Sequence, residues 1–153
     1  DVERSRGLGD VYKRQAISSN EYIHGFEISN PKNKKFEFKA YKVSKRRYED
    51  ISTITGAFYY ENILNKKSVA RFAFGGMAGI PKRSKSLENL FKENPENNFD
   101  ENNIETAIKS DFQPLTDCRA TSQYRQRVAE NLFKKFTFFV NREFDREEII
   151  GVS

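Results

Sequence analysis

Cysteine, histidine, methionine and tryptophan are almost missing from this chain. It has one Cys (Cys118), one His (His24), one Met and no Trp. A disulfide within the chain is therefore excluded, and so is a Cys/His set for zinc or for an iron–sulfur cluster. A single cysteine is also typical of a cytoplasmic protein, which is the localisation we expect.

Long apolar runs are missing as well. None approaches the ~18 residues of a membrane span, and the N-terminal end has no apolar signal-peptide core, so we expect no membrane contact. His24 is the one histidine of the chain and lies inside a predicted strand, so no nucleophile–base–acid site can be assembled around it. Gly75-Gly76-Met77 lacks the spacing of a phosphate-binding loop and indicates close backbone packing at a strand end instead.

The charges of the chain are balanced rather than one-sided. Lys and Arg number 27 against 22 Asp and Glu, which leaves a net charge of +5 spread along the sequence. We therefore do not expect a nucleic-acid partner. With 37% hydrophobic residues and 14 Phe in 153 residues, the chain can bury one phenylalanine-rich core.

The first residues of the chain resemble a translated sequencing adaptor. Residues 10–15 (DVYKRQ) are the in-frame translation of GAT GTG TAT AAG AGA CAG, a transposase adaptor end, and SRGLG at residues 5–9 continues the same adaptor. We therefore predict that residues 1–15 are an artefact and exclude them from the fold. The expected natural coding sequence begins near Ala16, inside a longer protein.

Four strands are predicted in the first half of the chain. Residues 21–28 and 36–43 alternate polar with apolar side chains and are expected to pair, with Phe36 and Phe38 in the core. Residues 51–60 and 69–74 predict a second hairpin around a polar turn at residues 65–68.

Helices are predicted in the second half. Pro81 suits a first helical position, and the following apolar spacing predicts a helix that ends at Asn94-Pro95. A short helix is expected from residue 102 or 103 to 109. The longest should start near residue 120 or 121 and bury the stripe Tyr124, Val128, Leu132, Phe136 and Phe139. Strands followed by helices predict the α+β class, an antiparallel sheet of three to four strands packed against about three helices.

Two further segments stand out. Residues 42–50 (KVSKRRYED) carry four cations and two carboxylates directly after a strand, which suits either a solvated loop or a preorganised polar site. Before the long helix, Asp117, Arg119 and Thr121 could cap the helix and form a local ion pair. Cys118 is interpreted as a small, half-buried residue rather than a reactive thiol.

Three segments together resemble one family. They are AYKVSKRRYEDIS (residues 40–52), RFAFGGMAGIPKRSKSLE (71–88) and PLTDCRATSQYRQRVAENLF (114–133). Their order and spacing resemble the C-terminal domain, of CO dehydrogenase flavoprotein type, of xanthine dehydrogenase small subunits. The resemblance implies the end of an FAD-binding domain at residues 16–30, the flavoprotein C-terminal domain at 31–143 and a tail at 144–153.

The resemblance also implies a function. Flavoproteins of this family bind FAD and pass electrons to NAD, after receiving them through two [2Fe–2S] clusters from a molybdopterin site. By matching position, Lys42 and Ile23 would contact the flavin, with Arg46, Arg47, Glu49 and Asp50 in a loop beside it. The clusters, the FAD phosphate site and the molybdopterin subunit would lie outside this chain, so we expect the chain alone to be inactive.

Alternatives remain open from the sequence. The flavoprotein subunit of a sibling molybdenum hydroxylase, of CO, nicotinate or aldehyde type, would share most of these segments. A small basic RNA-binding module is a more distant alternative, for which exposed aromatics beside Lys or Arg on one sheet face would be diagnostic. The substrate, the electron acceptor and the oligomeric state do not follow from the sequence.

Overall fold

The computed structural model describes residues 20, 22, 24, 25, 27, 36–46, 51–61, 68–94 and 99–150, with side chains up to residue 141. The chain divides into two compact units, Asp1–Lys34 and Lys35–Ser153. The predicted adaptor segment, residues 1–15, lies outside the described residues. In the strand predicted over residues 21–28, the described positions 22, 24, 25 and 27 are not in a strand, so the prediction is wrong there.

The second unit is built on an antiparallel sheet with the strand order β1-β2-β3-β4. The strands are β1 (Phe36–Val43), β2 (Ile54–Glu61), β3 (Val69–Gly75) and β4 (Lys82–Arg83). The bounds of β1 agree with the prediction, and β1 pairs with β2. The start of β2 is three residues later than predicted, because Ile51 is exposed and the burial alternation begins at Ile54.

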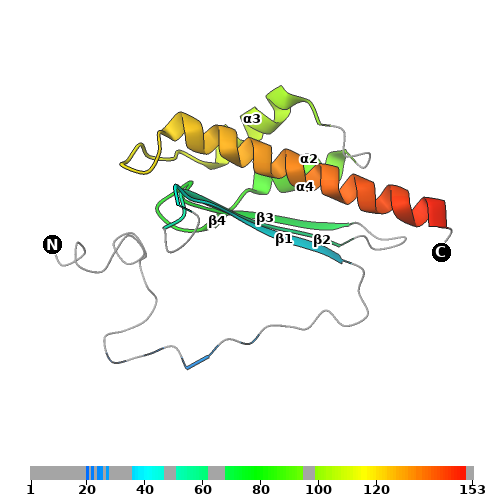
Figure 1. Cartoon of the computed structure of the whole chain (residues 1–153), viewed down its shortest axis with the longest axis horizontal. Helices are drawn as coiled ribbons and strands as arrows, with labels where there is room; N and C mark the ends of the chain where they lie inside the picture. The colour runs from blue at the N-terminus through cyan, green and yellow to red at the C-terminus, as the bar shows by residue number, and fades with distance from the viewer. Residues whose placement is uncertain are drawn as a thin grey trace. The chain divides into compact units, whose positions relative to one another are not determined.

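The described helices are α2 (Lys85–Glu93), α3 (Glu101–Asp111) and α4 (Ser122–Ile150), and they lie on one face of the sheet (Figure 1). Pro81 does not start a helix, because Ser84 is the N-cap of α2 and its Oγ accepts a hydrogen bond from Leu87 N at 3.3 Å. Thr121 caps α4 by accepting from Tyr124 N at 3.2 Å. The predicted α+β class is confirmed.

The core between the sheet and the helices is made of phenylalanine rings. Phe72 of β3 lies edge-on to Phe133 of α4, with ring centroids 5.3 Å apart, and Phe58 of β2 lies 5.3 Å from Phe136 of α4. Edge-to-face aromatic pairs add to the free energy gained from apolar burial. The largest fully buried side chains are Phe58, Phe72, Phe74, Phe112, Phe133, Phe136, Ile54, Met77, Leu87, Ile104, Ile108 and Val140.

Helix α2 is attached to the edge of β3 by a buried carboxylate. Glu88 Oε1 accepts from Phe72 N at 3.0 Å and from Arg83 Nε at 2.8 Å, while Arg83 Nη2 donates to Oε2 at 2.6 Å. The helix start is held by Asp111, whose Oδ2 accepts from Ser84 Oγ at 2.6 Å. Buried polar groups need such partners, so the sheet edge and the helix are fixed together.

Two predictions about the core are wrong. Phe36 and Phe38 are 39% and 52% exposed, because the helices cover the other side chains of β1. Among these, Lys39 places its Nζ 3.9 Å from the centre of the Phe139 ring. Tyr124 was expected in the buried stripe of α4 but is 49% exposed.

No helix in the described part of the chain is long and apolar enough to cross a membrane.

Two phenylalanines of α4 test this core directly. Phe136 is fully buried and Phe138 is 68% exposed. We expect Phe136→Ala to lower the free energy of unfolding by about 3–5 kcal/mol, because it removes a ring and leaves a cavity. Phe138→Ala, the matched control, should change it by less than about 0.5 kcal/mol. Urea unfolding followed by circular dichroism measures both, and equal losses would contradict the described packing.

Candidate functional site

Lys42 is exposed near the end of β1, on the side of the sheet turned away from the helices. Its neighbours Tyr41 and Val43 pack against the core, and successive side chains of a strand point to opposite faces. Its Cα partner on β2 is Thr55, which in turn faces Gly75 on β3. Lys42 therefore lies beside small residues at the ends of two neighbouring strands.

The side of the sheet away from the helices, which we call the open face, has small residues at its centre. Ala40, Ala57 and Ala73 lie in register across β1, β2 and β3. Toward the start of β1, the Phe36 ring stacks on Tyr59 with centroids 5.5 Å apart and an interplanar angle of 25°. The open face is formed by Phe36, Phe38, Ala40, Lys42, Thr55, Ala57, Tyr59, Arg71 and Ala73.

Arg125, in the first turn of α4, has a buried guanidinium that binds three separate segments. Its Nη1 donates to Thr53 O at 2.5 Å and to Gly76 O at 2.9 Å, and its Nη2 donates to Asp117 Oδ1 at 2.7 Å. The residue is 5% exposed. One side chain thus joins the entry of β2, the turn after β3 and the loop before α4.

Asp117 organises the loop on the other side of this ion pair. Its Oδ1 also accepts from Arg119 N at 2.9 Å and from Ala120 N at 3.0 Å. Burial alone would raise the pKa of Asp117, but the bonds from Ala120 N, the Arg125 side chain and Arg119 N outweigh it and lower the pKa below 3.8. The predicted local ion pair of Asp117 with Arg119 is replaced by the pair with Arg125.

Gly76 permits the close approach of these segments. Its φ is +80°, and a Cβ there would lie 2.3 Å from Thr53 O and 3.1 Å from Arg125 Nη1. Any larger residue would push into the carbonyl that Arg125 binds. The interpretation of Gly75-Gly76 as close backbone packing is therefore confirmed.

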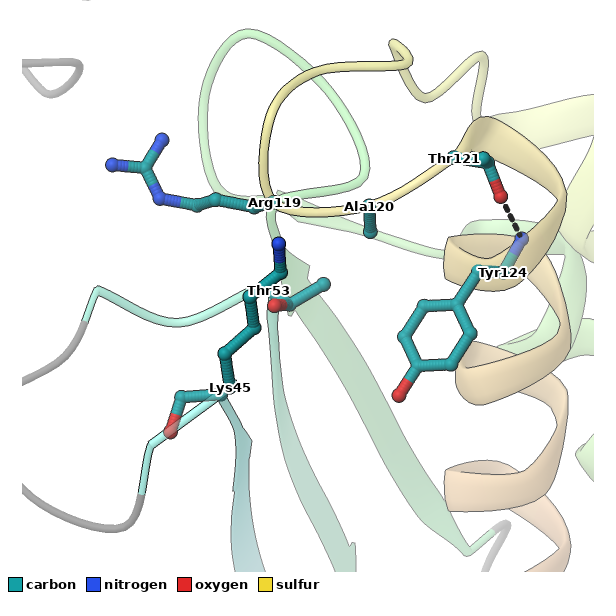
Figure 2. A pocket seen from close by; sticks show the side chains of 7 residues that line it. Lys45, Thr53, Arg119, Ala120, Thr121 and Tyr124 are labelled. Carbon is teal, nitrogen blue, oxygen red and sulfur yellow. Dashed lines mark hydrogen bonds between the residues drawn. The ribbon is translucent and has the colours of Figure 1, made fainter.

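A pocket of about 380 Å³ opens between the end of β1, the entry of β2 and the start of α4 (Figure 2). Lys45 reaches across it, and its Nζ donates to Cys118 O at 2.8 Å. Arg119 extends away from Tyr124 in this view. Cys118 is exposed, so the half-buried position expected for it is wrong. The pocket is lined by Ser44, Lys45, Thr53, Arg119, Ala120, Thr121 and Tyr124.

The predicted flavin-side residues are only partly described. Lys42 and Arg46 are both exposed, at and just after the end of β1. Ile23, Arg47, Glu49 and Asp50 lie outside the described residues. Within the described ranges, no three His, Cys, Asp or Glu side chains gather to hold a metal ion.

Sequence reasoning missed Arg125, although a signal for it exists. Arg125 precedes Ala129 by four residues and Phe133 by eight, so it continues the buried stripe of α4. A charged residue in line with an apolar stripe indicates a buried ion pair, since a lone buried charge is costly. The partners, however, are up to 72 residues away and follow no local pattern.

The Asp117–Arg125 pair predicts an acid-dependent stability. Because folding lowers the pKa of Asp117 below 3.8, the stabilisation is fully present above that value and is lost as pH falls through the folded-state pKa. We expect Asp117→Asn to lower the free energy of unfolding by about 1 kcal/mol at neutral pH, because water screens a carboxylate whose side chain is 35% exposed. The difference from the unchanged chain should hold at about pH 5 and shrink below pH 3.8. Urea unfolding across this range measures it, and a difference that persists in acid would contradict the assignment.

The two glycines after β3 give a matched test of the close approach. We expect Gly76→Ala to cost at least about 2 kcal/mol of unfolding free energy, because of its positive φ and the contact with Thr53 O. Gly75→Ala should cost little, since its Cβ would meet Thr55 Cβ at an ordinary 3.6 Å. Thermal unfolding of both variants measures the difference. Similar midpoints for Gly76→Ala and Gly75→Ala would show that the turn does not require a glycine at position 76.

Comparison with solved structures identifies the fold. A Cu,Mo-CO dehydrogenase in its cyanide-inactivated form matches with a TM-score of 0.52 at 16% identity, over 65% of this chain and 35% of that chain. The reconstituted CO dehydrogenase of Oligotropha carboxidovorans matches with a TM-score of 0.52 at 15% identity, over 65% and 35% of the two chains. Quinoline 2-oxidoreductase of Pseudomonas putida 86 gives 0.52 at 13% identity, over 71% and 38%.

This chain thus spans about a third of the length of the solved chains that it matches. No curated protein matches it in sequence. Residues 39–138 match the model of the CO dehydrogenase flavoprotein C-terminal domain. This match covers more than half of the chain. The chain belongs to the family of CO dehydrogenase flavoprotein C-terminal domains.

Proposed function

We propose that this chain is the C-terminal part of the FAD-binding subunit of a molybdenum hydroxylase, which passes electrons from iron–sulfur clusters through FAD to NAD. The observation that carries the proposal is the family match over residues 39–138. On this proposal, the FAD phosphate site and the clusters belong to upstream domains, and a molybdopterin-binding subunit or domain is the partner. The chain alone would then lack catalytic activity.

The substrate type separates two versions of this proposal. The segment KRRYEDIS at residues 45–52 resembles the xanthine dehydrogenase branch and leads us to favour a xanthine-type enzyme. A sibling enzyme fits equally well, because the matched solved structures are a CO dehydrogenase and a quinoline 2-oxidoreductase. Assaying the complete enzyme with xanthine, CO, nicotinate and an aldehyde distinguishes the two versions.

The open face fits a planar, electron-accepting ring. The row Ala40, Ala57 and Ala73 has short side chains, so a flat group can approach the backbone there. Lys42 brings a cation to the same face. In the complete subunit, bound FAD would supply the electron transfer itself. The ammonium of Lys42 would donate to a polar edge and favour added negative charge, which raises the tendency to accept electrons.

The open face also carries the feature that the RNA-binding alternative requires. Phe36 and Phe38 are exposed, and Lys42 and Arg71 share their face. The Phe36 ring, however, already stacks on Tyr59, which leaves it less free to stack on a base. The family match favours the flavoprotein, and a filter-binding assay with single-stranded RNA tests the alternative.

Lys42 is the side chain on which the proposal depends most. In the complete flavoprotein subunit, Lys42→Met keeps the apolar stem and removes the charge. We expect an about tenfold weaker flavin affinity or a lower flavin midpoint potential, with slower NAD reduction. Flavin content after gel filtration, a potentiometric titration and steady-state NAD reduction measure these effects.

Lys39→Met is the matched control, because Lys39 lies on the same strand with its Nζ over the Phe139 ring on the helix side. This variant removes the same charge and should leave flavin affinity and potential unchanged. If Lys42→Met also leaves flavin content, potential and NAD reduction at their original values, the role assigned to Lys42 is wrong.

A further inference from the structure

Arg125 binds the backbone beside Thr55 and Gly75, which lie in one row with Lys42 across β1, β2 and β3. Thr53, whose carbonyl accepts from Arg125 Nη1, precedes Thr55 by two residues, and Thr55 is the Cα partner of Lys42. Gly76, whose carbonyl accepts from the same Nη1, follows Gly75, the next partner in that row. The guanidinium thus holds the ends of β2 and β3 from the helix side of the sheet.

The end of β1 is connected to the same group. Thr53 N donates to Val43 O at 2.7 Å, so the carbonyl and the amide of Thr53 link Arg125 to the residue after Lys42. A shift of Arg125 would therefore displace two neighbouring pairs, Lys42 with Thr55 and Thr55 with Gly75. Arg125 thus hydrogen-bonds the backbone both at the entry of β2 and just after the end of β3.

Stability alone is a weak reason for this arrangement. The Arg125 guanidinium is buried and loses its hydration, while the Asp117 side chain stays 35% exposed and is screened by water, so the pair itself adds little stability. What such a pair provides is geometry, since each bond has a direction that apolar packing lacks. Asp117 fixes the orientation of the guanidinium, and its Oδ1 is itself held by two backbone N–H groups.

We propose that Arg125 and Asp117 are positioning residues for the flavin site, and that they hold Lys42 in place from the opposite side of the sheet. This inference rests on the proposed function, because it takes Lys42 to be the flavin-side residue. Neither residue would touch the cofactor. Their effect would pass through Thr53 and Gly76 to the row formed by Lys42, Thr55 and Gly75.

Amide hydrogen exchange on the 153-residue chain is the first test, and it needs no flavin. We expect Asp117→Asn to speed exchange of the Thr53 amide about tenfold, because the carbonyl on the same residue is held less firmly. The control is Glu88→Gln, which neutralises a carboxylate that also binds an arginine side chain and a backbone N–H, and that anchors α2 to β3. It should speed exchange at Phe72 and leave Thr53 unchanged. Unchanged exchange at Thr53 in Asp117→Asn would overturn the proposal.

Flavin binding in the complete subunit is the second test. We expect Asp117→Asn to weaken flavin affinity about tenfold and to shift the midpoint potential in the same direction as Lys42→Met. Glu88→Gln, which makes the same carboxylate-to-amide change at a different helix anchor, should leave both at their original values. If Lys42→Met acts and Asp117→Asn does not, or if both carboxylate variants act alike, the positioning role is overturned and the proposed function stands. If Lys42→Met is silent, the role assigned to Lys42 is wrong and this inference fails with it, while the proposed flavoprotein function, which rests on the family match, stands.

Discussion

The burial of one guanidinium, that of Arg125, is the constraint on which the arrangement of this domain depends. Apolar burial holds the helices against the sheet but is not directional, so the phenylalanine core alone would tolerate small rotations of α4. Arg125 removes that freedom, because its bonds to Thr53 O, Gly76 O and Asp117 Oδ1 can be made together in one orientation only. The positive φ of Gly76 follows from the same requirement.

The fold was largely predictable because most of its elements follow simple periods. β1 agrees with its two-residue alternation, and α3 and α4 agree with helical spacing to within a few residues. The failures have physical causes. In β1 the more hydrophobic side chains, Phe36 and Phe38, point outward, because Tyr41, Val43 and the stem of Lys39 cover the core side. The helix expected to start at Pro81 starts after Ser84 instead, because the Ser84 hydroxyl caps it.

Less of the candidate site than of the fold could be predicted from the sequence. Lys42 was found by family resemblance, and its exposure is compatible with that assignment without testing it. Arg125 was missed because a charged residue near a helix start is usually solvated, and only its alignment with Ala129 and Phe133 indicates burial. Contacts between residues as distant as Thr53 and Arg125 depend on the whole fold, so no local pattern could have predicted them.

The one-sided core has a consequence for the character of the open face. Among the residues whose side chains the structure describes, the fully buried phenylalanines lie between the sheet and the helices, so this interior does not use the open face. The alanines at the centre of that face expose less apolar area than the rings of Phe36 and Phe38 toward one end. The face also has a direction, with exposed aromatics at the Phe36 end and a cation at the Lys42 end, so an incoming neighbour can distinguish its two ends.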